Sequence, residues 1–267
     1  MMPTTFKEFI LPCKNNKSLG NLLFIHGFCV DHTYFTAANK LSEHFDVYMI
    51  DLPGHGTNND NITPKDLKLN KMAQYIVDYI NFKKLDNIYL MGHSMGGALV
   101  SLVERLIPTK IKKLILVCPA NPAAIHAGLK SFYIFYPKNM EQKTRLLRCL
   151  YAPNNFDTYS KNPAWMAMNQ KQLSFQLANW KNMKKLFHNI SWAILTYVKK
   201  AQKQIQTPTL LMVGKYDQTI PAYHTLKFFK KHLPEHVLTT YQFDQSGHLV
   251  FEEEEPIFID QILKFVK

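Results

Sequence analysis

Ser94 stands between two glycines in the stretch LMGHSMGGALV, which covers residues 90–100. An apolar run precedes this serine, and a segment with helical periodicity follows it. A serine held on a tight turn between a strand and a helix can act as a nucleophile toward a carbonyl carbon. Gly92 and Gly96 would relieve the crowding of such a turn, because glycine has no side chain. We therefore predict that Ser94 is a nucleophile, with an ordinary strand-to-helix connection as the alternative.

A serine nucleophile needs a base, and the base needs an acid that orients it. Downstream of Ser94 the candidates are Asp217 in GKYDQTIP and His248 in QSGHLVF. Each follows a predicted strand, so both belong to the carboxyl edge of the predicted sheet, where open α/β sheets bind ligands. Asp244 is a rival acid four residues before His248, and we interpret it as a turn former. The sequence thus predicts a triad of Ser94, Asp217 and His248.

Two backbone N–H groups are predicted to form an oxyanion hole, which stabilises the negative charge of a tetrahedral intermediate. Phe28 follows the predicted strand that ends in FIHG, and Met95 is the first residue after Ser94. These two residues are the natural pair, since each lies directly after a strand or at the start of a helix. We interpret four nearby polar residues as structural supports of the turns: His26, Asp51, His55 and His93.

Short apolar runs alternate with helical periodicity over most of the chain. Six runs are predicted to be buried strands: 21–27, 46–51, 87–93, 113–119, 208–214 and 238–243. Five segments are predicted to be helices: about 34–44, 66–82, 95–107, 222–232 and 255–266. Alternation of this kind predicts the α/β class, with a mostly parallel sheet that carries helices on both faces.

Residues 121–205 interrupt the alternation. They contain no convincing strand, hold all three tryptophans, and read as a helical insertion, which leaves 1–120 and 206–267 as the core. The aromatic segments SFYIFY (131–136) and AWMAM (164–168) are apt for an apolar acyl chain, although they would equally serve to pack the insertion itself. The predicted substrate-binding residues are Phe132, Tyr133, Phe135, Tyr136 and Trp165.

Five segments together resemble the α/β-hydrolase superfamily in order and spacing: HGF (26–28), DLPGHG (51–56), GHSMGG (92–97), GKYDQTIP (214–221) and SGHLVFEEEEP (246–256). The resemblance covers almost the whole chain except the insertion. It implies the α/β-hydrolase fold, and it implies that residues 121–205 form a helical cap, or lid, over the active site. The N-terminus departs from the pattern because it is short, so the first antiparallel strands are expected to be reduced.

Within that superfamily the pattern is most similar to carboxylesterases and monoacylglycerol-lipase-like enzymes. The resemblance implies a serine hydrolase that cleaves carboxylic esters of apolar acyl groups through an acyl-enzyme on Ser94, with no metal or organic cofactor. Two alternatives stay open. One is a menaquinone-pathway-like C–C lyase that acts on a carboxylate-rich substrate, and the other is a non-catalytic ligand-binding protein of the same fold. Activity toward simple aryl esters distinguishes an esterase from the lyase, which should largely lack it.

The formal net charge is +12, and residues 122–205 carry thirteen Lys or Arg against two acids. A basic field attracts anionic lipid or acidic substrates. The alternative is that the charge reflects a lysine-rich composition and has no binding role. No nucleic-acid-binding motif accompanies the charge, so we do not expect nucleic acid as a partner. We expect a small-molecule ester as the partner, with a lipid-derived ester as one candidate. We also expect peripheral contact of the basic cap with an anionic membrane. The absence of a signal-peptide or membrane-spanning pattern, and four scattered cysteines, predict a cytoplasmic protein with free thiols.

Overall fold

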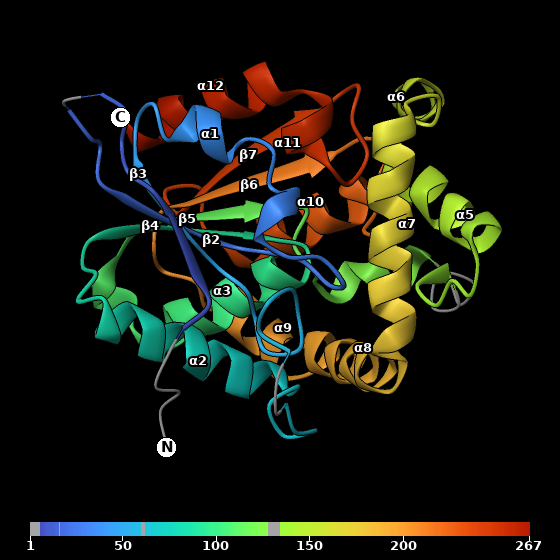
Figure 1. Cartoon of the computed structure of the whole chain (residues 1–267). Coiled ribbons are helices and arrows are strands. Elements are labelled where there is room, and N and C mark those ends of the chain that lie inside the picture. The colour runs from blue at the N-terminus through green and yellow to red at the C-terminus, as the bar shows by residue number, and fades with distance from the viewer. Residues whose placement is uncertain (1–5, 16, 60–61, 128–133) are drawn as a thin grey trace.

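Seven strands form one sheet in the part of the chain that the computed structural model describes, residues 6–15, 17–59, 62–127 and 134–267. Their spatial order is β1-β3-β2-β4-β5-β6-β7 (Figure 1). β1 (Glu8–Leu11) pairs antiparallel with β3, and all other neighbouring strands are parallel. The predicted α/β class with a mostly parallel sheet is therefore confirmed.

All six predicted strands are present, with ends that differ by at most two residues. They are β2 (Asn21–Ile25), β3 (Asp46–Ile50), β4 (Ile88–His93), β5 (Ile111–Val117), β6 (Thr209–Gly214) and β7 (Leu238–Phe243). The sequence patterns did not reveal β1. This four-residue strand lies at the edge of the sheet, and none of its residues is fully buried, so it lacks the continuous apolar signal of the central strands.

Alternate residues of the strands face two apolar cores, as the pleat of a strand requires. In β2, Leu23 and Ile25 belong to one core, whereas Leu22 and Phe24 belong to the other. The first core is covered by α2 (Leu69–Phe82), α3 (Met95–Leu106), α9 (Tyr197–Gln202) and α10 (Ala222–His232). The second is covered by α1 (Ala38–Leu41), α11 (Val250–Glu253) and α12 (Glu255–Val266). Helices thus cover both faces of the sheet.

The single helix predicted over 34–44 is wrong. The segment forms a 3₁₀ turn, η1 (His32–Tyr34), and then the short helix α1. Asp31 caps η1 because its side chain accepts a hydrogen bond from the Thr33 N–H. Phe35 then leaves the helical region, with φ −81° and ψ 81°, so that the apolar spacing continues while the helix does not.

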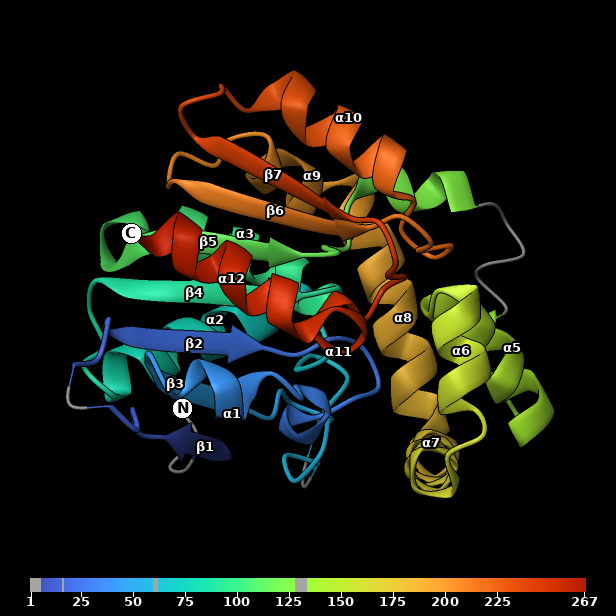
Figure 2. The same cartoon turned by 90° about the horizontal axis from the view of Figure 1, so that it is seen from above.

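Between residues 121 and 205 the described positions form helices and no strand. The elements are η3 (Pro122–Ala127), α5 (Met140–Leu150), α6 (Pro153–Tyr159), α7 (Pro163–Ala178), α8 (Trp180–Leu195) and α9. Figure 2 shows α5 to α8 beyond the ends toward which the parallel strands point. α8 and α9 also contribute buried residues to the first core, and α9 contacts α3. The division into core and cap at residue 205 stays a prediction.

The chain changes direction across the sheet between β2 and β4. β2 leads to β3 on one side, whereas β4 lies on its other side. Later in the chain, a further 3₁₀ turn, η2 (Pro108–Lys110), connects α3 to β5. An open α/β sheet binds ligands outside the carboxyl ends of its strands at such a switch point. Phe28 follows β2 and Ser94 follows β4, so the fold places both at this point.

Two further features of the described residues concern membrane spans and cysteines. No helix among them is long and apolar enough to cross a membrane. Cys13, Cys29, Cys118 and Cys149 are all free, as the scattered cysteines predicted.

Candidate active site

Ser94 occupies the tight turn between β4 and α3. Its φ of 56° and ψ of −119° are a strained conformation for a residue with a side chain. A Cβ on Gly92 would lie 2.3 Å from the Gly96 carbonyl oxygen, and a Cβ on Gly96 would lie 2.1 Å from the carbonyl oxygen of Ile25. Both distances are far below van der Waals contact. The two glycines therefore permit the turn itself and the close approach of α3 to β2.

Backbone hydrogen bonds hold the strained residue from the neighbouring strand. The Ser94 N–H donates to the Val117 carbonyl at 3.0 Å, and the Ser94 carbonyl accepts from the Ala120 N–H at 2.8 Å. Met95 is the first residue of α3, where backbone N–H groups have no acceptor within the helix. The positive end of the helix dipole and this N–H both favour negative charge beside Ser94.

The turn after β2 lies against Ser94. A Cβ on Gly27 would be 3.2 Å from the Cβ of Ser94, so only a residue without a side chain fits there comfortably. Phe28 follows Gly27 and lines the same cavities as Ser94. The structure thus places the two predicted oxyanion-hole residues, Phe28 and Met95, beside the predicted nucleophile.

Asp217 and His248 are paired in the buried floor of the site. Nδ1 of His248 lies 2.5 Å from Oδ2 of Asp217, and both residues are about 5% exposed. Because a carboxylate only accepts, Nδ1–H is the donor, and Nε2 of the neutral ring is left as an acceptor. The other carboxylate oxygen accepts from the Thr219 N–H, the Thr219 hydroxyl and the Ile220 N–H at 2.7–2.9 Å. Four donors thus fix the orientation of one carboxylate.

The loop that carries His248 is fixed from two directions. A Cβ on Gly214 would lie 1.7 Å from the Gly247 carbonyl oxygen, so the turn before Asp217 packs directly on the turn before His248. From the other side, the His248 N–H donates to the carbonyl of Leu150, at the end of α5, at 2.5 Å. A helix of the predicted cap is therefore hydrogen-bonded to the loop of the predicted base.

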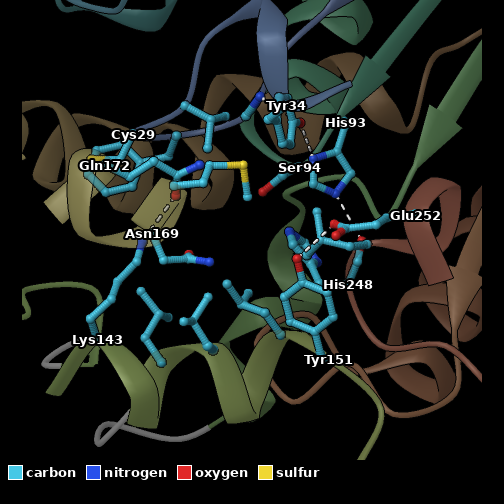
Figure 3. A pocket seen from close by; sticks show the side chains of 18 of the residues that line it. Cys29, Tyr34, His93, Ser94, Lys143, Tyr151, Asn169, Gln172, His248 and Glu252 are labelled. Carbon is cyan, nitrogen blue, oxygen red and sulfur yellow. Dashed lines mark hydrogen bonds between the residues drawn. The ribbon is translucent and has the colours of Figure 1, made fainter. Parts of the chain in front are cut away.

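His93 connects three parts of the site through a buried chain of hydrogen bonds (Figure 3). Its Nε2 lies 2.9 Å from the carbonyl oxygen of His248, which can only accept, so Nε2 carries the proton. Nδ1 then accepts from the Tyr34 hydroxyl at 2.5 Å, and the hydroxyl oxygen accepts from the Gly27 N–H at 3.1 Å. Burial and the nearby His248 ring hold the pKa of His93 well below its usual range. A neutral His93 therefore links the Gly27 turn to the His248 loop.

The remaining polar residues of the sequence analysis lie around the site without entering it. His26 is fully buried, with Nε2 accepting from the Leu52 N–H at 3.0 Å and Nδ1 beside the Gly27 carbonyl at 2.8 Å. Asp51 accepts hydrogen bonds from His32 and Thr57. These bonds fix the loop after β3 against the turn after β2.

The rival acid and a neighbouring thiol have different surroundings. Asp244 is exposed and lies 3.8 Å from Nζ of Lys215, away from His248.

Cys118 groups with Asp217 and His248, with potential ligand atoms within 4.8 Å of one another. Burial, and then the negative charge of Asp217, raise the pKa of this thiol well above its usual range. Since a metal ligand must be a thiolate, and the other two groups already bind each other, the set does not fit a metal site.

Two cavities meet at Ser94. The first, about 890 Å³ including its open part, is also lined by His93 and His248, and it extends to polar residues of α5 and α7. The second, about 920 Å³, is lined mostly by apolar side chains of α8 and of the loops after β5 and β6. Phe28 and Phe135 line both cavities, so they lie where the two join.

The predicted substrate-binding residues have different positions. Phe135 lines both cavities, whereas Tyr136 packs against Trp180 and Phe187 and is absent from both linings. Trp165 is buried among aromatic side chains of α6 and the end of α5, outside both linings. Phe132 and Tyr133 lie outside the described residues.

Sequence reasoning missed several polar residues of the first cavity. They are Lys143, Asn169, Gln172, Gln176 and Glu252. No local motif could have identified them, because their positions depend on how α5 and α7 pack over the sheet.

Comparison with known proteins gives a consistent result. A family model described as alpha/beta hydrolase fold matches residues 20–255. A relative from Mycoplasma genitalium that bears the name "Putative esterase/lipase 2" is 26% identical over 98% of this chain and 94% of its own length. Among solved structures, an esterase from Exiguobacterium antarcticum has a TM-score of 0.75 at 18% identity, covering 98% of this chain and 96% of its own. An enol-lactonase from Burkholderia xenovorans has a TM-score of 0.75 at 15% identity, covering 97% and 95%.

Tyr34→Phe tests the hydrogen-bond chain through His93. The change removes one hydroxyl and leaves the Gly27 N–H and Nδ1 of His93 without their partner in a buried place. We expect the free energy of unfolding to fall by about 1–3 kcal/mol, as measured by urea denaturation.

Tyr241→Phe is the matched control, because the Tyr241 hydroxyl has no hydrogen-bond partner among the described residues. Its free energy of unfolding should stay within about 0.5 kcal/mol of the wild type. Equal stabilities for the two variants would contradict the role of Tyr34.

Proposed function

The chain belongs to the alpha/beta hydrolase family, and from this membership we propose that it is a serine esterase that hydrolyses carboxylic esters of apolar acyl groups. Its esterase/lipase-like relatives support the hydrolase class. The observation that carries the proposal is the pairing of Asp217 with His248, which lines a cavity together with Ser94.

The mechanism follows from the tautomer of His248. Nε2 has a free lone pair and takes the proton of the Ser94 hydroxyl as Oγ attacks the ester carbonyl carbon. The N–H groups of Phe28 and Met95 hold the resulting oxyanion. The C–O bond to the alcohol then breaks, and the alcohol leaves with the proton from His248. An acyl-enzyme on Ser94 remains.

Deacylation repeats these steps with water as the nucleophile. His248 removes a proton from water, which attacks the acyl carbonyl, and then returns the proton to Ser94. Asp217 stays ionised and stabilises the imidazolium at each stage. No metal or organic cofactor takes part in the proposed reaction. A small-molecule ester is the proposed substrate, and the cytoplasmic location and the membrane contact of the basic helices stay proposals.

Hydrolysis of p-nitrophenyl esters from acetyl to palmitoyl tests the function. We expect kcat/KM to rise with acyl length at first, because each buried CH₂ group contributes about 0.8 kcal/mol, and to fall once the chain exceeds the second cavity. Ser94→Ala should lower kcat by about 10⁴-fold or more.

Ser174→Ala is the control for this series, since Ser174 is exposed on α7 and lines neither cavity. It should hydrolyse the esters at the wild-type rate. A folded wild-type protein that hydrolyses none of the esters would overturn the proposal, and a carboxylate-rich lyase substrate would be tried next.

Asp217→Asn tests which carboxylate orients the base. The amide can present its NH₂ group to Nδ1 of His248, which would favour the wrong tautomer, so kcat should fall by about 10³- to 10⁴-fold. Asp244→Asn removes the exposed rival and should leave kcat unchanged. The opposite result, with loss of activity only in the Asp244 variant, would refute the assignment. Circular dichroism checks that both variants fold.

A further inference from the structure

Lys143 is a buried cation with no anionic partner among the described residues. The residue is 6% exposed, and Nζ donates a hydrogen bond to Oε1 of Gln172 at 3.3 Å. A charge buried in this way is costly unless something compensates it. Lys143 differs in this from Lys138 and Lys171 of the same region, which are exposed.

The acids of this region are already used by other residues. Residues 122–205 contain only two, Glu141 and Asp157. Glu141 pairs with Arg145 at 2.5 Å, and Asp157 lies 3.8 Å from Arg148. Lys143 shares α5 with both arginines but faces inward. Its partner therefore has to come from elsewhere.

Lys143 lines the first cavity together with Ser94 and His248. Figure 3 shows it on the side of α5 and α7, where Asn169 and Gln172 add amide groups. Glu252 lies on the opposite side of the cavity in the same view, with Oε2 accepting from the Tyr151 hydroxyl at 2.7 Å. The cavity thus offers a cationic end that is separate from its acidic residue.

The position of His248 tells which part of an ester enters the first cavity. His248 has to give a proton to the departing alcohol, so the alcohol lies on its side of Ser94. His248 lines the first cavity and is absent from the lining of the second. The apolar second cavity then remains for the acyl chain.

We propose that Lys143 binds an anionic oxygen group, a carboxylate or a phosphate, on the alcohol side of the ester substrate. The inference rests on the proposed esterase function and adds the substrate class. Burial lowers the pKa of Lys143 to about 8, and a bound anion beside Nζ would raise this pKa again because it stabilises the charged form. The substrate class is an apolar acyl group joined to an alcohol that carries negative charge.

Three aryl butyrates test the proposal: the esters of methyl 4-hydroxybenzoate, of 4-hydroxybenzoate and of 4-hydroxyphenyl phosphate. The first is neutral, the second carries a carboxylate and the third carries a phosphate. We expect the wild type to prefer at least one anionic ester over the neutral ester by about 10- to 100-fold in kcat/KM, as a charge-assisted hydrogen bond would produce. The stronger of the two preferences identifies the anion.

Lys143→Met keeps the apolar stem and removes the charge, so the ratio of anionic to neutral kcat/KM should fall to about one, whereas Lys143→Arg should retain part of it. Lys171→Met removes the same charge from the exposed face of α7 and should leave the ratio unchanged. An equal fall in the Lys171 variant would assign the effect to the general basic field and overturn the site.

The outcomes distinguish failure of the anion site from failure of the proposed esterase function. Turnover of all three esters by the wild type with a ratio near one would overturn the anion site and leave the esterase proposal standing. No turnover of any ester by the folded wild type would overturn the proposed function, and the inference with it.

Discussion

The close approach of α3 to β2 is the contact on which the site depends. Gly96 lies so near the Ile25 carbonyl that no side chain fits between the two backbones. This approach brings the positive end of α3 beside the turn after β2, and it forces Ser94 into its strained conformation. The hydrogen bonds to Val117 and Ala120 and the packing of the parallel sheet offset the free-energy cost of this conformation.

Two independent sets of hydrogen bonds hold His248 relative to that turn. Asp217 fixes the ring from below, while His93 fixes the backbone carbonyl and connects it through Tyr34 to Gly27. The His248 loop and the turn that carries Gly27 and Phe28 are thereby parts of one buried network. The two cavities then diverge from Ser94. One has a buried cation and amide groups among apolar side chains, and the other is lined almost wholly by apolar side chains.

The sheet and the placement of the candidate triad could be predicted from sequence because they depend on local patterns. Apolar runs define the strands, and Ser94, Asp217 and His248 each follow one of them. Burial that depends on packing between distant segments could not be predicted. Lys143 is one of thirteen basic residues between 122 and 205, and nothing in its neighbours distinguishes it until α5 packs beside α7. For the same reason Trp165, predicted to bind substrate because the AWMAM segment suits an acyl chain, lies in an aromatic cluster outside both cavities.

Covalent labelling with a fluorophosphonate tests whether Ser94 is an activated nucleophile. The Ser94 oxygen would form a bond to phosphorus, the P–F bond would break, and the proton would pass to His248. We expect one label per folded chain, which peptide mass spectrometry locates on Ser94. The label should be absent after heat denaturation, and the labelling rate should be much lower in His248→Ala. A label on another residue, or no label on the folded protein, would contradict the assignment of Ser94 as the nucleophile.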